Sequence, residues 1–323
     1  MKNKRILGQY FTTSTSWLTD TVKQFIISSK MKVAYDPFAG SGDMIRTIRP
    51  LMPTAVGLDV DKTFGWQYND SLVNIPHIDN AVIVTNPPYL AKNSAKGRGL
   101  LRHVSKYFSM TKYNDLYLLA LERMLDAQDY VVAIVPETFL NSSFPKDRLV
   151  SITILERNPF SDTEIPVCIV CFGPASNQNA KIYKDNKYVT TLYTLRKHIL
   201  IPSRKLKMAF NVPNGNVGLR SIDGVNQANR IKFMLPEQLN YDVSTIKITS
   251  RMITVIKIPS LPAHKVDAFV AICNKLLEEY RQVTNDLLLS PFKNNTSAGI
   301  RRRRLDFKTA RSIMERAYWM LAL

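Results

Sequence analysis

The sequence has little cysteine, little histidine and no long apolar run, and each absence excludes a class of protein. Its three cysteines, Cys168, Cys171 and Cys273, are an odd and sparse set among 323 residues, which argues against a disulfide framework and favours a reducing, cytoplasmic setting. No run of about 18 apolar residues is present, so no membrane span is expected. Residues 1–11 lack the apolar stretch of a secretory signal. The four histidines show no ligand spacing, and no metal site is predicted.

Acidic residues are also scarce, but only in one half of the chain. The sequence has 44 Lys and Arg against 26 Asp and Glu, a net charge of +18. Residues 1–173 carry 19 basic and 16 acidic side chains, whereas residues 174–323 carry 25 and 10. A nearly neutral first half joined to a basic second half indicates one part that performs chemistry and another that holds a polyanion. Solubility alone also accounts for a charge of this sign.

The pattern of apolar residues predicts two domains. Up to residue 172, short apolar runs alternate with helical patterns, which is typical of an α/β fold with a mostly parallel sheet and helices on both faces. The expected strands are 32–35, 55–58, 79–85, 130–135 and 167–172, and the expected helices are 43–49 and 115–127. A polar linker follows, so we place a first domain at 1–173 and a second, basic, mixed α+β domain at 174–323. The second domain is expected to close with helices at 263–289 and 306–321.

A glycine turn follows the first predicted strand. Residues 36–42 read DPFAGSG, and Gly40 and Gly42 allow the backbone to turn tightly close to a ligand. Asp36 opens the turn, and an acid there suits a cationic or amine-bearing ligand better than a phosphate. Asp59 ends the next strand, at the position where nucleotide-binding folds place a carboxylate for ribose hydroxyls. A purely structural strand-to-helix turn is the alternative.

A second turn, at residues 86–89, reads NPPY and directly follows the apolar run AVIVT. Two successive prolines cannot continue a central strand, because neither supplies an N–H group. They fix the directions of the Asn86 amide, the Pro87 carbonyl and the Tyr89 ring. Two fixed acceptors beside an aromatic ring suit a planar group that carries an –NH₂. A plain Pro-Pro loop with a buried tyrosine is the alternative.

Three motifs in this order, GQYFT at 8–12, DPFAGSG at 36–42 and NPPY at 86–89, resemble the gamma class of DNA adenine-N6 methyltransferases of bacterial type II restriction-modification systems. The resemblance covers residues 6–172. It implies a Rossmann-like sheet that binds S-adenosylmethionine. It also implies transfer of a methyl group to the exocyclic N6 amine of an adenine that is flipped out of double-stranded DNA.

The resemblance also implies roles for individual residues. At the methionine end of the cofactor it implies Tyr10, Phe11, Thr12, Asp36, Gly40 and Gly42. It implies Asp59 at the ribose hydroxyls, and Val60 and Asp70 at the cofactor's adenine, with Asp70 holding the adenine amine. Phe38 and Ser71 are implied as further cofactor contacts. It implies Asn86, Pro87, Pro88 and Tyr89 around the target base. Phe160 resembles the aromatic residue that stacks on the flipped base; Phe144 is its competitor, and a plain core role for Phe160 stays open.

The resemblance and the charge together predict DNA contacts. The second domain is expected to recognise the DNA target. A mobile basic loop at 91–112 is expected to lie near the DNA backbone, and a plain surface loop is the alternative. Its basic residues are Lys92, Lys96, Arg98, Arg102 and Lys106. Arg301, Arg302, Arg303 and Arg304 are either a phosphate clamp or a solvated charge run. We expect a monomer, with a cognate restriction endonuclease as a further partner. The alternatives are a methyltransferase that acts on RNA or on a protein glutamine through the same turn, and a catalytically silent DNA-binding subunit.

Overall fold

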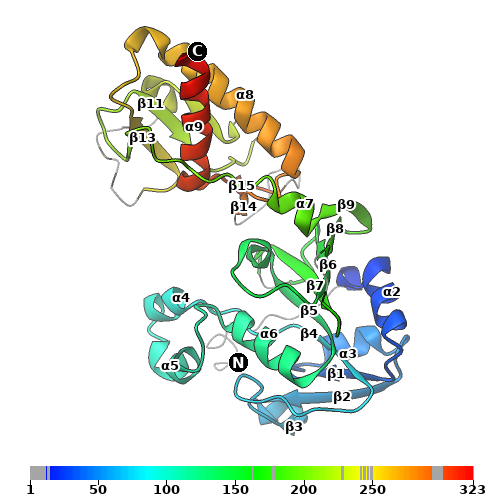
Figure 1. Cartoon of the computed structure of the whole chain (residues 1–323). Coiled ribbons are helices and arrows are strands. Elements are labelled where there is room, and N and C mark those ends of the chain that lie inside the picture. The colour runs from blue at the N-terminus through cyan, green and yellow to red at the C-terminus, as the bar shows by residue number, and fades with distance from the viewer. Residues whose placement is uncertain are drawn as a thin grey trace. The chain divides into compact units, whose positions relative to one another are not determined.

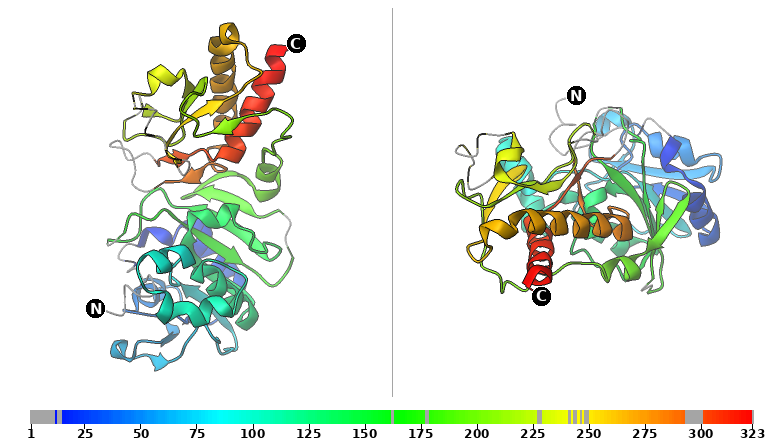
Figure 2. Two further views of the ribbon diagram at one scale, coloured as in Figure 1. Left: turned by 90° about the vertical axis from the view of Figure 1, so that its left-hand side faces the viewer. Right: turned by 90° about the horizontal axis from the view of Figure 1, so that it is seen from above.

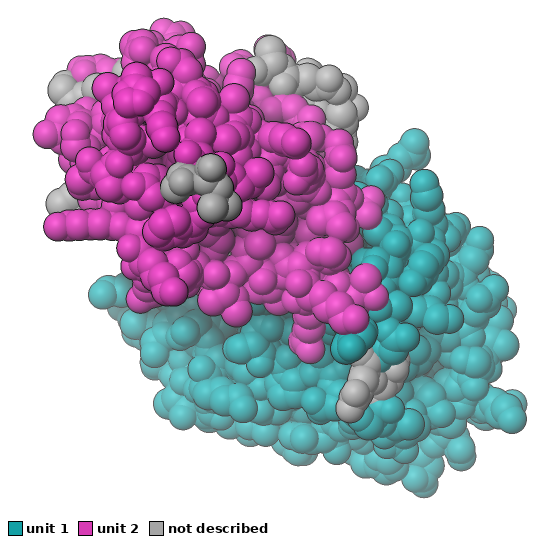
Figure 3. All heavy atoms as spheres, turned by 45° about the horizontal axis from the view of Figure 1, so that its top comes forward, with its two compact units in different colours: residues 1–193 teal, residues 194–323 magenta. Residues whose placement is uncertain are grey.

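The computed structural model describes residues 12, 15–161, 163–176, 179–226, 229–240, 242, 245, 247, 250–292 and 301–322. The predicted cofactor residues Tyr10 and Phe11 lie outside these residues. The chain divides into two compact units, Met1–Tyr193 and Thr194–Leu323, which are coloured separately in Figure 3. No helix in the described part of the chain is both long enough and apolar enough to cross a membrane.

The first unit is built on a nine-stranded sheet in the order β3-β2-β1-β4-β5-β7-β6-β8-β9. Neighbouring strands from β3 to β5 pair in parallel, whereas β7 is antiparallel to both β5 and β6. The fold prediction of a mostly parallel α/β sheet is therefore confirmed. The strands are β1 (Val33–Asp36), β2 (Thr54–Asp59), β3 (Gln67–Tyr68), β4 (Ala81–Thr85), β5 (Tyr130–Pro136), β6 (Leu149–Ile154), β7 (Val167–Phe172), β8 (Lys181–Lys184) and β9 (Lys187–Thr191).

The central strands are apolar along their whole length because both faces of the sheet are covered. All five residues of β4 and all six of β7 are buried. The helices of this unit are α2 (Asp20–Ser29), α3 (Asp43–Ile48), α4 (Lys92–Gly97), α5 (Leu101–Ser109) and α6 (Leu116–Ala127). The connection from β1 to β2 leads toward one edge of the sheet, and the connection from β4 to β5 leads toward the other edge. Because connections between parallel strands are right-handed, the helices in these two connections, α3 and α6, lie on opposite faces of the sheet. Figure 1 shows α2 and α3 on one side of the sheet and α6 on the other.

The strand order reverses between β1 and β4, which lie side by side at the centre of the sheet. Open α/β sheets bind ligands at the carboxyl ends of the strands at such a point. Residues 36–42 follow β1 and residues 86–89 follow β4, so the two turns singled out in the sequence meet at this edge.

Two features of the first unit differ from the sequence-based expectation. Residues 91–112, expected to be a loop, contain the helices α4 and α5, and α5 forms because Val104, Tyr107 and Phe108 share one buried face. The compositional boundary near residue 174 also differs from the structural division after Tyr193. The reason is that β8 pairs with β6, and β9 with β8, so the segment after residue 180 extends the first sheet.

The second unit combines a small antiparallel sheet with two helices. The sheet has the order β10-β13-β11-β12. The helices α8 and α9 pack against each other and lie next to each other in Figure 1 and in the left view of Figure 2. The predicted closing helices and the mixed α+β character thus match these elements. They are α7 (Leu192–Arg196, across the division), β10 (Ala209–Phe210), β11 (Val217–Arg220), β12 (Lys232–Met234), β13 (Ile253–Lys257), α8 (Val266–Thr284), β14 (Ser290–Pro291), β15 (Arg303–Arg304) and α9 (Phe307–Ala322).

Candidate active site at the carboxyl ends of β1, β2 and β4

Asp36 lies at the centre of the site, at the end of β1. Its Oδ1 accepts hydrogen bonds from the Thr85 hydroxyl at 2.5 Å and from the Phe38 N–H at 3.0 Å. Its Oδ2 is buried and has no hydrogen-bond partner among the described residues. Burial raises the pKa of Asp36 from 3.8 to about 7, against the lowering effect of these two hydrogen bonds. Such an unpaired carboxylate oxygen can accept a hydrogen bond from a positively charged donor of a ligand.

The glycine turn passes between Asp36 and Asp59. Gly40 and Gly42 have φ of +49° and +79°, which side chains rarely adopt, so the turn needs glycine at both positions. The Gly40 N–H donates to Asp59 Oδ2 at 2.7 Å, and the Asp61 N–H donates to Asp59 Oδ1 at 2.7 Å. Burial raises the pKa of Asp59, while these backbone donors lower it. The two N–H groups fix the carboxylate at the end of β2, and each oxygen keeps a second lone pair.

Trp66 covers this turn from outside and was not singled out from the sequence. Its Nε1–H donates to the Gly40 carbonyl at 2.8 Å. A Cβ atom at Gly57 would lie 2.6 Å from the indole ring, and one at Gly42 would lie 3.0 Å from it. The ring therefore packs directly on the backbone of β2 and of the turn, and it holds both in place.

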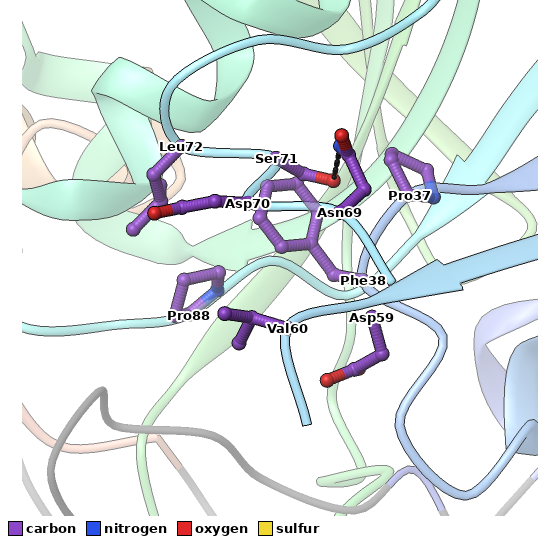
Figure 4. A pocket seen from close by; sticks show the side chains of 9 residues that line it. All are labelled: Pro37, Phe38, Asp59, Val60, Asn69, Asp70, Ser71, Leu72 and Pro88. Atoms are coloured by element: carbon purple, nitrogen blue, oxygen red, sulfur yellow. Dashed lines mark hydrogen bonds between the residues drawn. The ribbon is translucent and has the colours of Figure 1, made fainter. Parts of the chain in front are cut away.

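A pocket that is partly open to solvent lies beside the turn (Figure 4). Its lining comes from the ends of four strands. The lining residues are Pro37 and Phe38 after β1, Asp59 and Val60 at β2, Asn69, Asp70, Ser71 and Leu72 after β3, and Pro88 after β4. The lining combines apolar side chains with the carboxylates of Asp59 and Asp70 and the amide of Asn69. This combination suits a flat ring system with polar edges.

Asp70 presents one free carboxylate oxygen in this pocket. Its Oδ2 accepts hydrogen bonds from Lys106 Nζ at 2.9 Å and from the Tyr107 hydroxyl at 3.0 Å. Its Oδ1 accepts none from the described residues. Ser71 is buried, and its hydroxyl accepts a hydrogen bond from Asn69 Nδ2 at 2.8 Å, drawn as a dashed line in Figure 4.

The NPPY turn brings Asn86 and Tyr89 together. The Tyr89 hydroxyl lies 2.5 Å from Asn86 Oδ1 and 2.8 Å from the Ile134 carbonyl oxygen. The Asn86 Nδ2 donates to Thr12 Oγ1 at 3.3 Å. The Asn86 amide is thus oriented with its oxygen toward Tyr89 and its nitrogen toward Thr12. The structure brings together the predicted residues Thr12, Asn86 and Tyr89.

Of the two candidates Phe160 and Phe144, it is Phe160 that lies beside Tyr89, whose other ring neighbour is Tyr117. The Phe160 ring lies 6.2 Å from the Tyr89 ring in an edge-to-face arrangement, and the Phe160 backbone forms a bridge with Thr12. Asn158 shapes this loop, because its Oδ1 accepts the Phe160 N–H at 3.0 Å. Phe144 instead packs in an aromatic cluster with Tyr113, Phe139 and Phe172. This arrangement distinguishes the two candidates by position.

These residues fit S-adenosylmethionine on the evidence of their own chemistry. The unpaired Asp36 Oδ2 suits the cofactor's ammonium group, and the fixed Asp59 carboxylate suits ribose hydroxyls. The pocket between Phe38, Val60 and Pro88 suits a flat purine, with Asp70 Oδ1 as an acceptor for its amine.

The predicted DNA contacts fall into two groups. Lys92, Lys96 and Arg98 are exposed on and after α4. The arginine run 301–304 is mostly held inside the second unit, which corrects the prediction for Arg303. Arg303 is only 3% exposed in β15, and the Arg302 guanidinium donates to the Asp223 carbonyl and covers the Phe292 ring. Arg303 is buried because its backbone N–H donates a hydrogen bond to the carboxylate of the buried Asp223, which also forms an ion pair with Arg281. Arg301 and Arg304 are half-buried.

No cluster of three or more potential metal ligands occurs within the described ranges. Cys168 and Cys171 are buried, free thiols within β7. The residues that the sequence did not indicate, Trp66, Lys106, Tyr107 and Asn158, act through contacts with other side chains or loops. Trp66, Lys106 and Tyr107 contact Gly40 or Asp70 from 26 to 37 positions away, so no local pattern marks them, whereas Asn158 contacts Phe160 only two positions away.

Residues 59–161 match the family model of the Eco57I restriction-modification methylase. This stretch includes Asp59, Asp70, the NPPY turn and Phe160, and it is less than half of the chain. A search of curated proteins gives no match.

Solved structures with a similar fold include several subunits of restriction-modification systems. The modification subunit of a proposed type I restriction enzyme from Vibrio vulnificus YJ016 is 14% identical, with a TM-score of 0.39 over 55% of this chain and 47% of that one. The type I methyltransferase subunit from Streptococcus thermophilus is 14% identical, with a TM-score of 0.36 over 55% and 48%. The EcoKI M protein is 13% identical, with a TM-score of 0.38 over 86% and 72%. The chain thus spans about half the length of the first two proteins. What the comparisons show for this chain is therefore similarity to a restriction-modification methylase over residues 59–161.

Proposed function

We propose that this protein is an S-adenosylmethionine-dependent DNA methyltransferase that modifies the N6 amine of an adenine flipped out of double-stranded DNA. The observation that carries the proposal is the NPPY turn at the end of β4, with the Asn86 amide fixed by Tyr89 and Thr12, next to the unpaired carboxylate of Asp36. The match of residues 59–161 to a restriction-modification methylase supports DNA as the substrate.

The bound cofactor supplies an electrophilic methyl group. Asp36, Asp59 and Asp70 hold its ammonium group, ribose and adenine amine. The remaining chemistry is positioning of the target amine. Asn86 Oδ1 and the Pro87 carbonyl accept its two N–H bonds, which favours a more pyramidal nitrogen with an available lone pair. Asn86 Oδ1 can accept this bond in addition to that from Tyr89, because an amide oxygen has two lone pairs.

No strong general base is required before transfer. The amine becomes acidic only after it has gained the methyl group, and it then loses its proton to solvent; Asn86 and Pro87 act as hydrogen-bond acceptors and do not take up the proton. Tyr89 and Phe160 provide the apolar surface for the flipped base. Their rings are in edge-to-face contact here, so one ring has to turn for a base to stack against both.

The second unit is proposed to hold the DNA. Residues 194–323 carry 22 basic and 9 acidic side chains, so most of the net positive charge of the chain lies in this unit. We propose that the protein acts as a monomer in the cytoplasm, beside an endonuclease that recognises the same site. Affinity for DNA is expected to fall steeply with salt, because phosphate contacts release counterions, whereas affinity for the cofactor is expected to change little.

The test is transfer of a labelled methyl group from S-adenosylmethionine to DNA, to structured RNA and to protein in parallel. We expect label in DNA alone, and none with Asn86→Ala, which retains cofactor binding. Label in RNA or in protein glutamine, with none in DNA, would replace the proposal by the corresponding alternative.

A further inference from the structure

The helix α5 contacts the cofactor pocket through two neighbouring residues, Lys106 and Tyr107. Lys106 Nζ lies 2.9 Å, and the Tyr107 hydroxyl 3.0 Å, from the same oxygen of Asp70, Oδ2. The Asp70 side chain is 19% exposed and lines the pocket. Both donors therefore act on one oxygen and leave the other, Oδ1, for a ligand.

The two donors differ in how firmly they are held. Tyr107 is 4% exposed, so packing fixes its hydroxyl. Lys106 is largely exposed, and its Nζ lies 4.6 Å from the centre of the Tyr107 ring, which keeps the ammonium close to Asp70. The hydrogen bond to Asp70 raises the pKa of Lys106, and burial raises that of Tyr107, so both groups carry their protons at neutral pH.

The segment that carries α5 is anchored beside the NPPY turn. Ala91 and Asp115 form an antiparallel bridge, with Lys92 N–H donating to the Asn114 carbonyl at 2.8 Å and Leu116 N–H to the Leu90 carbonyl at 3.1 Å. The two ends of the segment 91–115 are thus held together by these hydrogen bonds. The segment begins directly after the NPPY turn, and it contacts Asp70 through Lys106 and Tyr107.

We propose that Lys106 and Tyr107 are positioning residues that aim Asp70 Oδ1 at the exocyclic amine of the cofactor's adenine and thereby make the pocket selective for adenine over hypoxanthine. The inference rests on the proposed function. An adenine amine donates to Oδ1, whereas the keto oxygen of hypoxanthine meets the carboxylate with a second acceptor. While Lys106 and Tyr107 bind Oδ2, the Asp70 carboxylate cannot rotate to relieve this repulsion. Without these hydrogen bonds it can rotate, and the selectivity is lost.

The experiment is calorimetric binding of S-adenosylhomocysteine and S-inosylhomocysteine to the full chain and to three variants. Lys106→Met removes one donor from an exposed position, and Tyr107→Phe removes a hydroxyl and keeps the ring. Arg102→Met is the matched control, because Arg102 is an exposed cation on α5 whose only described side-chain partner is His103. Thermal melts establish that the variants are folded.

We expect the wild type to favour the adenine ligand, and the ratio of the two dissociation constants to fall about three- to tenfold in Lys106→Met and in Tyr107→Phe, with no change in Arg102→Met. A wild type that binds both ligands equally, or variants that keep the wild-type ratio, would overturn the inference and leave the proposed function standing. A wild type that binds neither ligand would overturn the cofactor assignment and this inference with it.

Discussion

The hydroxyl of Tyr89 lies 2.5 Å from Oδ1 of Asn86, so the aromatic residue of the NPPY turn orients its amide. The same hydroxyl contacts the Ile134 carbonyl on β5, which ties the turn to the next strand of the sheet. The two residues thus form one unit, in which Tyr89 contributes both a stacking surface and the direction of the Asn86 amide.

Tyr89→Phe separates these two roles of Tyr89. The ring stays, but the hydrogen bond to Asn86 is lost, and the amide becomes free to rotate. We expect the single-turnover rate of methyl transfer to fall about tenfold, because a misoriented acceptor costs about 1 kcal/mol or slightly more. Cofactor affinity is expected to stay unchanged. Rapid-quench assays and calorimetry measure the two quantities, and an unchanged rate would show that the hydroxyl does not position the amide.

Phe160→Ala and Phe144→Ala form a matched pair. Phe160 contacts Tyr89 and is proposed to stack on the flipped base. Its loss is expected to reduce kcat/KM on DNA by about 100-fold, because its ring no longer offsets the free energy that is needed to unstack the base from the duplex. Phe144 lies in the cluster with Phe139 and Phe172, so its loss is expected to cost about 3–5 kcal/mol in the free energy of unfolding. Urea unfolding and steady-state kinetics distinguish the two effects. The opposite assignment, with Phe144 needed for rate rather than stability, would exchange their roles.

Asp36 makes the stability of the first unit depend on pH. Its pKa is raised from 3.8 to about 7 by burial, so between these values the folded state binds a proton that the unfolded state has released. The free energy of unfolding is therefore expected to fall as pH rises from about 4 to about 7, by on the order of 2–4 kcal/mol at most.

Asp36→Asn removes this pH dependence, because the amide does not titrate. We expect a flatter profile of unfolding free energy in urea melts across this range, together with loss of cofactor binding. Asp126→Asn, at an exposed position on α6, is the control and is expected to leave the slope unchanged. A profile with the same slope in Asp36→Asn and wild type would contradict the assignment.

Gly57→Ala tests the packing of Trp66 on β2. The added Cβ would lie 2.6 Å from the indole ring, so the ring has to move away from the Gly40 carbonyl that it contacts. We expect a loss of about 1–3 kcal/mol in unfolding free energy and a weaker affinity for the cofactor. Gly97→Ala is the control, because a methyl group at Gly97 would meet no atom within 4 Å, and the change is expected to be neutral or slightly stabilising. Equal stability of the two variants would contradict this packing.

The sequence predicted the elements whose signal is local. The strands β1, β2, β4, β5 and β7 are apolar runs, and α6 (Leu116–Ala127) matches the helix expected at 115–127. The position of the site also followed from the sequence, because the carboxyl ends of parallel strands meet at one edge of the sheet. The polar residues at these ends, Asp36, Asp59 and Asn86, therefore could be grouped before their contacts were known.

The features that the sequence did not predict depend on contacts between distant residues. Lys106 looked like a DNA-facing cation because it belongs to a basic stretch, but it pairs with Asp70, 36 positions away. Arg303 looked like part of an exposed charge run, but Asp223, 80 positions away, draws its backbone into the second unit. A basic stretch has the same composition whether its side chains bind phosphate or complete a fold, so composition alone does not distinguish these outcomes.

The most direct test of the central claim is nucleoside analysis by mass spectrometry of DNA that lacks other methylation, after reaction with the wild type and with Asn86→Ala. We predict N6-methyladenine with the wild type, confined to one short sequence motif when the same DNA is read by long-read sequencing, and none with the variant. N4-methylcytosine in place of N6-methyladenine, or N6-methyladenine at wild-type levels with Asn86→Ala, would contradict the central claim.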